Sequence, residues 1–228
     1  MPRLTMLLLL LFFLSLPRTT SASEHRCVNQ PEVLVSSDNQ ETIAEVCRAS
    51  ERAIRFLAEY GLTPKREIKF SIIEDRIDSH GYIAYGSYDS RSDSIQLMSY
   101  ASILAGSENP MMYGEPFDRV HYSGAIAHEV SHAVVQHNLL FKPLSTGPQE
   151  YLAHSTQLAV IPEQRKNAII RAMDVDPWQS GDAISDIYMA IEPGKFAVKS
   201  YRHLTTMNDP QSFVKMLLNA KWFYVYVP

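Results

Sequence analysis

Five consecutive residues, His128-Glu129-Val130-Ser131-His132, have the types and spacing that metal-assisted hydrolysis needs. Residues four apart project from one face of an α-helix, about 5–6 Å apart at Cβ, so two imidazoles can hold one Zn²⁺. Glu129 lies one step around the helix, where its carboxylate can take a proton from a metal-bound water. The pattern therefore predicts a helix that carries two zinc ligands, His128 and His132, and a general base, Glu129.

A third zinc ligand is predicted in the segment that follows. Glu150 opens the next predicted helix after a loop with Pro143, Gly147 and Pro148, and the second helix can fold back on the first. Two histidines and one carboxylate leave a fourth position open for water, as a catalytic zinc requires. The simpler interpretation of Glu150 is a first-turn acid that favours the helix dipole. His154, one turn later, is a candidate orienting partner or substitute ligand.

The helix predicted over residues 118–137 gives the motif a suitable setting. At about 100° per residue, the face opposite the two histidines carries Ile126, Val130, Ala133 and His137. That face would pack on the core, so His137 is interpreted as a core histidine rather than a ligand. His121, two turns before His128, is placed where it could reach the rim of a cleft.

The order of the predicted elements indicates an α+β fold. Strands are predicted at residues 32–36, 67–73, 81–88 and 94–99, and a helix at 39–60. Later segments have helical patterns, at 118–137, 148–160, 162–173, 182–191, 194–206 and 210–220. Residues 106–115 are predicted as a loop, and 222–227 as a final strand or a tail that covers an apolar surface. Strands followed by a run of helices are typical of α+β rather than alternating βαβ domains.

The motif and the following glutamate resemble the gluzincin branch of the zincin metallopeptidases. The matching residues are His128, Glu129, His132 and Glu150. The resemblance implies a zincin-like fold, in which a small, twisted, mostly antiparallel N-terminal sheet and the active-site helix precede a helical C-terminal part. It also implies an edge strand antiparallel to bound substrate, which residues 94–99 match by order alone.

Three positions depart from named subgroups of zincins. His154 stands where thermolysin-like members have an acid that orients a zinc histidine, and Gln149 stands where they have an asparagine. The third histidine of metzincins is absent, because that position is Asn138.

The resemblance further implies an electrophile from the C-terminal part that stabilises the oxyanion. Tyr201 and His203 are predicted for this catalytic role, and Tyr188 is a further candidate. A packing tyrosine and a surface histidine are the alternative interpretation of the first two.

The N-terminus predicts export. Residues 1–22 combine Arg3, an apolar run at 4–16 and small residues near position 21, as a cleaved secretory signal does; an uncleaved anchor is the alternative. In an oxidising compartment the two cysteines, Cys27 and Cys47, are predicted to form a disulfide rather than two free thiols. We expect a secreted or periplasmic protein with no stable membrane span after signal cleavage, since no other apolar run approaches membrane length.

Composition fits a single folded domain over residues 23–228. Within it we expect a lobe of sheet and motif helix at 23–140 and a helical lobe at 141–228. The chain of 228 residues is 46% hydrophobic and 20% charged, which excludes a disordered or low-complexity protein. The net charge is −4 with no basic block, which argues against a nucleic-acid partner.

These features together predict an exported zinc-dependent metallopeptidase that acts on a peptide or protein substrate. The alternative is an inactive zinc-binding module of the same fold that binds a protein or peptide partner, because a chain of this size leaves little room for deep pockets. Its cleft would be lined by Tyr82, Tyr85 and Met98. A metal-free exported domain with an accidental motif is the third interpretation.

Overall fold

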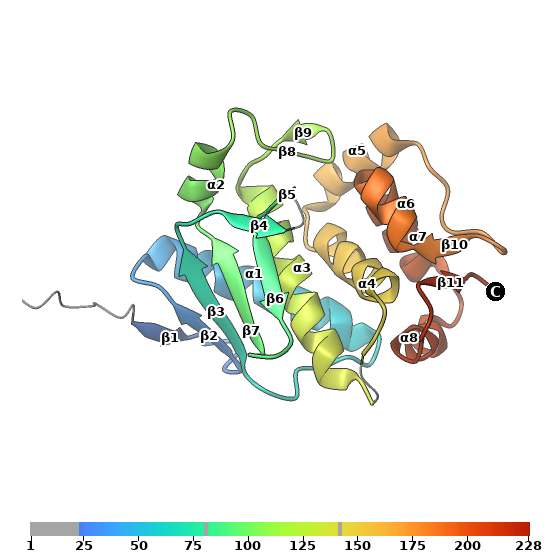
Figure 1. Ribbon diagram of the computed structural model, residues 1–228, viewed down its shortest axis with the longest axis horizontal. Helices are drawn as coiled ribbons and strands as arrows, with labels where there is room; N and C mark the ends of the chain where they lie inside the picture. Colours follow the sequence, from blue (N-terminus) through green and yellow to red (C-terminus); the bar gives the residue numbers. More distant parts are fainter. Residues whose placement is uncertain (1–22, 80–81, 141–142) are drawn as a thin grey trace, which may run out of the picture.

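A five-stranded sheet and the helices packed on it form the N-terminal part of the molecule (Figure 1). The computed structural model describes residues 23–79, 82–140 and 143–228, so the predicted signal peptide, residues 1–22, lies outside the described residues. The strands in spatial order are β1 (Glu24–Arg26), β2 (Val33–Ser36), β3 (Ile68–Ile73), β7 (Ser94–Met98) and β6 (Gly86–Asp89).

The sheet is mixed, and the mostly antiparallel sheet implied by the resemblance is not found. The two outer pairs, β1–β2 and β6–β7, are antiparallel, whereas β2–β3 and β3–β7 are parallel. Helix α1 (Gln40–Glu59) connects β2 to β3. Because such a crossover returns the chain to the same end of the sheet, it makes its two strands parallel neighbours.

Helix α1 begins and ends where the local sequence favours it. The side chain of Asn39 accepts a hydrogen bond from the backbone N–H of Thr42, and Gly61 adopts a φ of +79° just beyond the helix. The predicted disulfide is present and joins Cys27, which follows β1, to Cys47 in α1. The N-terminal strand is thereby tied to the first helix.

The strand predicted at residues 81–88 is two strands that separate at Tyr85. β5 (Tyr82–Ala84) pairs with β4 (Ile77–Ser79), whereas β6 pairs with β7 at the edge of the main sheet. Helix α2 (Tyr100–Gly106) was not predicted. The predicted loop at 106–115 contains most of a short hairpin, formed by β8 (Met111–Met112) and β9 (Glu115–Pro116). Strands of two or three residues are too short to leave a periodic pattern.

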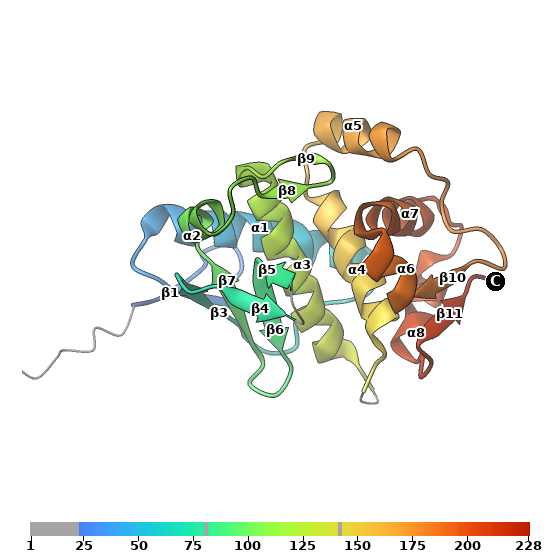
Figure 2. The ribbon, with the colours of Figure 1, turned by 45° about the horizontal axis from the view of Figure 1, so that its top comes forward.

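The C-terminal part is helical, as predicted (Figure 2). The motif helix α3 (Arg119–Asn138) precedes it, and its own helices are α4 (Thr146–Ala159), α5 (Glu163–Met173), α6 (Asp186–Ile191), α7 (Pro193–Thr206) and α8 (Pro210–Leu218). The predicted helix at 182–191 instead opens with strand β10 (Ala183–Ser185). That strand pairs with β11 (Tyr224–Tyr226), which confirms the final strand.

A single buried apolar cluster joins the two predicted lobes. It extends from Cys27 and Val33 through α3 and α4 to Val225 and Val227. Helix α3 packs against both α1 and α4, and α4 packs against α7. The motif helix is therefore at the centre of the molecule and is held from both sides. Among the described residues no helix is long and apolar enough to cross a bilayer.

Candidate metal centre

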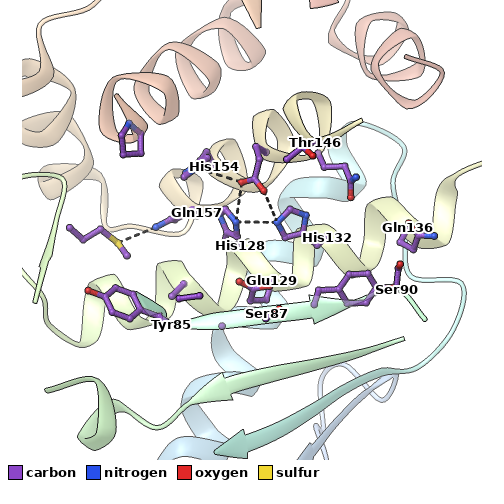
Figure 3. A pocket seen from close by; sticks show the side chains of 18 of the residues that line it. Tyr85, Ser87, Ser90, His128, Glu129, His132, Gln136, Thr146, His154 and Gln157 are labelled. Atoms are coloured by element: carbon purple, nitrogen blue, oxygen red, sulfur yellow. Dashed lines mark hydrogen bonds and ion pairs between the residues drawn. The ribbon is translucent and has the colours of Figure 1, made fainter. Parts of the chain in front are cut away.

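Helix α3 directs its motif side chains to two sides. Asp118 caps the helix and accepts hydrogen bonds from the backbone N–H groups of Val120 and His121. Figure 3 shows His128 and His132 directed toward α4, while Glu129 lies toward β6. The predicted inner face, Ile126, Val130, Ala133 and His137, is buried.

His137 is a buried histidine with polar partners, as expected. Its Nδ1 accepts a hydrogen bond from the backbone N–H of Lys65 at 3.3 Å, so Nε2 carries the hydrogen. That Nε2 donates to Asp93 Oδ1 at 3.0 Å. His137 therefore ties the end of α3 to the turn between β6 and β7, away from the two motif histidines.

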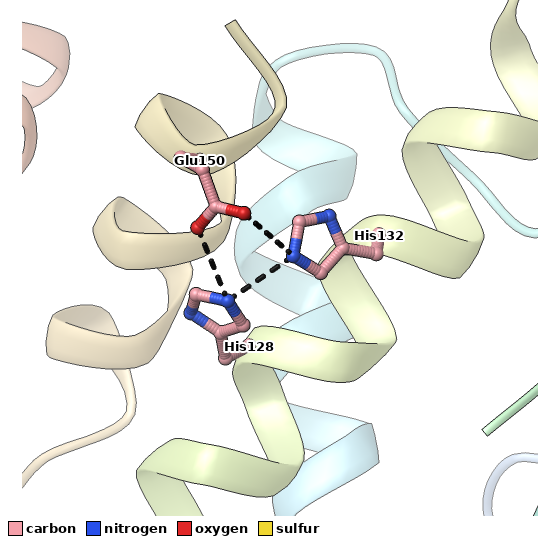
Figure 4. Close-up of side chains that lie close together, drawn as sticks. All are labelled: His128, His132 and Glu150. Carbon is pink, nitrogen blue, oxygen red and sulfur yellow. Dashed lines mark hydrogen bonds and ion pairs between the residues drawn. The ribbon is translucent and has the colours of Figure 1, made fainter. Parts of the chain in front are cut away.

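The structure brings His128, His132 and Glu150 together (Figure 4). One potential ligand atom from each lies within 4.8 Å of the other two. The Nε2 atoms of the histidines are 3.1 Å apart, and the Glu150 oxygens lie 3.4 Å from His128 Nε2 and 3.5 Å from His132 Nε2. Helix α4 thus presents Glu150 to the histidine face of α3, as the third-ligand prediction requires.

The pKa values of this cluster favour an ionised Glu150 and a neutral His132. Burial lowers the pKa of His132 to about 4. Burial alone would raise the pKa of Glu150, but the charge of His132 and the hydrogen bond from His128 hold it well below its usual range. Burial also opposes a charge on His128, yet Glu150 raises the pKa of His128 to about 9. A metal ion here would take the place of that proton.

Gln157 orients His128, and sequence reasoning missed it. Its Oε1 lies 3.1 Å from His128 Nδ1; because an amide oxygen only accepts, Nδ1 carries the hydrogen and Nε2 is free to face Glu150. Gln157 is seven residues after Glu150, on the same face of α4. That helical spacing is the signal that could have revealed it. Its amide oxygen, about two helical turns after Glu150, holds the His128 ring from the side opposite Glu150.

His154 lies beside the cluster without belonging to the set of three. Its Nε2 is 3.7 Å from Glu150 Oε2, and its ring meets the His128 ring edge-on at 4.8 Å between centroids. Burial lowers the pKa of His154 to about 3, so the ring is neutral. Its Nδ1 is buried, and no described group bonds to it. Both interpretations of His154, as an orienting group and as a substitute ligand, fit this position.

Glu129 is enclosed between α3 and β6. It receives a hydrogen bond from the backbone N–H of Tyr88, and burial raises its pKa to about 7. An ideal Cβ at Gly86 would lie 2.7 Å from Glu129 Cγ, so only glycine leaves room for this carboxylate. β6 therefore forms the wall against which Glu129 is held.

The cluster opens on a cavity of about 840 Å³. Its wall includes β6, the β8–β9 hairpin, α3, α4 and the start of α7. The edge strand at the cavity is β6. Strand β7 (residues 94–98) lies inside the sheet, between β3 and β6, so the prediction that residues 94–99 form the edge strand is wrong. Tyr85 lines the cavity, Met98 is a core residue, and the side chain of Tyr82 lies outside the described residues.

The C-terminal candidates for the oxyanion do not reach this cavity. His203 is buried beside a separate, smaller cavity, where its Nδ1 is bonded to the Tyr151 hydroxyl at 2.8 Å. Tyr201 packs against Lys166, and Tyr188 packs against Trp178. The structure therefore does not support the oxyanion role predicted for Tyr201 and His203, because their side chains contact α4, α5 and α8 and do not line the cavity.

His121 also lies away from the cavity, contrary to expectation. It is fully buried and stacks on Phe117. Its ring lies within 3.6 Å of carboxylate oxygens of Glu115 and Asp118, which also pair with Arg165. This side chain helps to join the β8–β9 hairpin, α3 and α5.

Comparison with protein families matches residues 33–226, which extend from β2 to β11 and include the whole candidate centre. The matched family is described as a family of unknown function (DUF6639). No curated protein and no solved structure matches the chain. The chain therefore belongs to the DUF6639 family.

Proposed function

We propose that this protein is an exported, zinc-dependent metallopeptidase that hydrolyses peptide bonds with Glu129 as general base. One observation carries the proposal. Donor atoms of His128, His132 and Glu150 converge at the wall of a large cavity, with a buried carboxylate, Glu129, beside them. Export is supported by the disulfide and by the apolar run at residues 4–16.

The donor set fits zinc better than the hard cations. Two imidazole nitrogens and one carboxylate are a common catalytic zinc set, whereas Ca²⁺ and Mg²⁺ prefer oxygen ligands alone. Gln157 adds the hydrogen bond to the far ring nitrogen that zinc-binding histidines usually make. His128, His132 and Glu150 would hold the ion, which would supply Lewis-acid polarisation of a carbonyl group and activation of a water.

The residues of the chain would supply the proton transfer and the substrate alignment. Glu129 is placed to accept a proton and later to return it to the leaving amine, and the wall formed by Gly86 and Tyr88 fixes its position. Strand β6 pairs with β7 on one side, and no described strand pairs with its other edge. A peptide in extended form can add to such an edge through backbone hydrogen bonds.

Metal content and one substitution test this proposal. The protein, expressed through an oxidising export route, is expected to contain one zinc ion per chain, and His132→Ala is expected to lose it. Glu129→Gln should keep the zinc and lower peptide hydrolysis by about 10²–10⁴-fold. Chelation should lower the melting temperature, and zinc should restore it.

The outcomes separate the competing functions. Wild-type protein without zinc after zinc-replete purification would contradict the proposal. One zinc per chain with no cleavage of any peptide in a broad library would favour the inactive binding module. Equal hydrolysis by wild type and Glu129→Gln would refute the role of Glu129.

A further inference from the structure

The cavity at the candidate centre has two chemically different ends (Figure 3). Tyr85 lies toward one end, and Ser90, Gln136 and Thr146 lie toward the other, with Glu129 between them. We call the first the apolar end. To it we assign Tyr85 with its chain neighbour Ala84, the hairpin residues Met111 and Met112, and Pro193 and Gly194 beside the hairpin; the amide of Gln157 lies at this end as well. The opposite end offers hydroxyl and amide groups.

The apolar end is built on the β8–β9 hairpin, which has an unusual turn. Tyr113 and Gly114 have φ values of +55° and +77°. Two positive values are what a type I′ hairpin turn requires, and a tyrosine seldom adopts one. An ideal Cβ on Gly194 would lie 3.8 Å from Tyr113 Cδ1, which places the tyrosine ring at the start of α7. Glu115 in β9 pairs with Arg165 of α5 at 2.8 Å. These contacts hold the hairpin at the cavity.

One side chain links the hairpin to the ligand cluster. Gln157 donates from Nε2 to Met112 Sδ at 3.0 Å, while its Oε1 is bonded to His128 Nδ1 at 3.1 Å. Met112 is therefore separated from a candidate metal ligand by a single amide group. A peptide side chain seated against Met112 would therefore lie beside the ligand cluster, on the His128 side.

The carboxylates and imidazoles of the cavity belong to the ligand cluster and to its two neighbours, Glu129 and His154. The described lining residues include no Lys, Arg or Asp. An apolar surface of methionine and aromatic groups gains free energy from burying another apolar group, and methionine adapts to its shape. A charged side chain would lose hydration there with no opposite charge to meet it.

From these observations we infer that the apolar end is a specificity subsite, which selects a large uncharged apolar side chain on one side of the scissile bond. The inference rests on the proposed peptidase function and adds its substrate class. Met112 and Tyr85 provide the contact surface, and Tyr113 positions the hairpin that carries Met112.

Cleavage profiling tests the subsite. The zinc-loaded wild type is incubated with a mixed library of peptides blocked at both ends, and the products are sequenced by mass spectrometry. Leu, Met and Phe should be enriched at least about tenfold over Asp and Lys at one position beside the cleaved bond. Met112→Gln, which keeps the side-chain size, should lower that enrichment severalfold without changing preferences at other positions. The matched control Met216→Gln, on α8, should leave the profile unchanged.

Binding provides a second measurement that does not depend on turnover. Blocked fluorescent hexapeptides that differ only in one central residue, Leu or Asp, are titrated into zinc-loaded Glu129→Gln. The Leu peptide should bind about tenfold more tightly, and adding Met112→Gln should remove most of that difference.

The results distinguish the two levels of inference. Cleavage or binding with no preference for apolar residues, or a preference that Met112→Gln leaves intact, would overturn the subsite and leave the peptidase proposal standing. Selective binding of the Leu peptide without cleavage by the wild type would support the subsite and count against peptidase activity. Absence of both cleavage and peptide binding in zinc-loaded protein would overturn both.

Discussion

Glu129 occupies the space that a side chain at position 86 would need. An ideal Cβ on Gly86 would stand 2.7 Å from Glu129 Cγ and 3.1 Å from its Cδ and Oε1. The absence of a side chain on one residue of the edge strand therefore determines where the carboxylate of the motif can lie.

Gly86→Ala is predicted to impair hydrolysis while leaving metal binding intact. The added methyl group must displace Glu129 or β6, and an error of about 1 Å in a catalytic group can cost roughly 10²-fold in rate. We expect kcat/KM to fall at least about tenfold while zinc stoichiometry stays at that of the wild type. Gly106→Ala is the matched control, because open space surrounds that position. Unchanged kinetics in Gly86→Ala would show that β6 does not position Glu129.

Gln157→Leu is predicted to weaken metal binding. Without the Gln157 acceptor, the His128 ring loses the hydrogen bond that fixes its orientation, and loss of such a partner typically costs about 10–100-fold in metal affinity. Competition with a chromogenic chelator measures this affinity. Gln211→Leu serves as control, since Gln211 donates to the backbone carbonyl of Glu59 in α1 and does not line the cavity. An unaltered zinc affinity in Gln157→Leu would remove the orienting role.

The part of the candidate site that lies on helices could be predicted from the sequence, whereas the part that the sheet contributes could not. Helical spacing places His128 and His132 on one face of α3, and the short connection to α4 lets Glu150 meet that face. Gly86 lies on a strand of four residues, whose edge position follows from pairing that no local pattern records. The roles predicted for Tyr201 and His203 rest on the family resemblance, and the structure gives both side chains other partners, Lys166 and Tyr151.

Removal of the disulfide is predicted to lower stability. Cys27 and Cys47 enclose a loop with a sequence separation of 20, for which the chain-entropy model gives about 3 kcal/mol. The double variant Cys27→Ser with Cys47→Ser should lose about this much free energy of unfolding in urea titrations. A reducing agent should destabilise the wild type by a similar amount and leave the variant unaffected. Equal unfolding midpoints for wild type and variant would contradict the prediction.

Asp93 is predicted to make stability fall at acid pH. Burial opposes its charge, but hydrogen bonds from Arg66, Tyr88 and His137 outweigh burial and lower the pKa of Asp93 to about 2. A carboxyl group with a lower pKa in the folded state stabilises the fold above its unfolded pKa, near 3.8. We therefore expect a contribution of about 2 kcal/mol at neutral pH, lost as pH falls from about 4 to 2.

The variant Asp93→Asn distinguishes the effect of the carboxylate charge on stability from that of the left-handed backbone conformation at this position. Asp93 has a φ of +53°, and asparagine tolerates that conformation well. Urea unfolding at pH 7 should show the variant to be less stable than the wild type, and the difference should shrink toward pH 2. A difference that stays constant across this range would assign the loss to something other than the carboxylate charge.

Sequence patterns predict the long helices correctly and the short strands poorly. Helix α1 was predicted within a residue at each end because Asn39 and Gly61 mark its ends. The strand predicted at 81–88 is divided because two different partners, β4 and β7, take its two halves. Parallel pairing of β3 with β2 and β7 depends on crossovers, and local alternation carries no information about them.

The ligand cluster and the strand that holds Glu129 in place come from separate segments of the sequence, and this affects the order in which the site forms during folding. The three candidate ligands lie between positions 128 and 150, on helices that follow one another, whereas Gly86 precedes Glu129 by 43 positions and must first be placed by pairing with β7. Closing a short loop costs less entropy than closing a long one, and contacts between distant segments form more slowly. The ligand cluster should therefore form early, with the docking of a helical hairpin, and the wall behind Glu129 should form late. If the proposed function holds, a folding chain would bind metal before it could hydrolyse a peptide bond, because Glu129 is positioned only after β6 has docked.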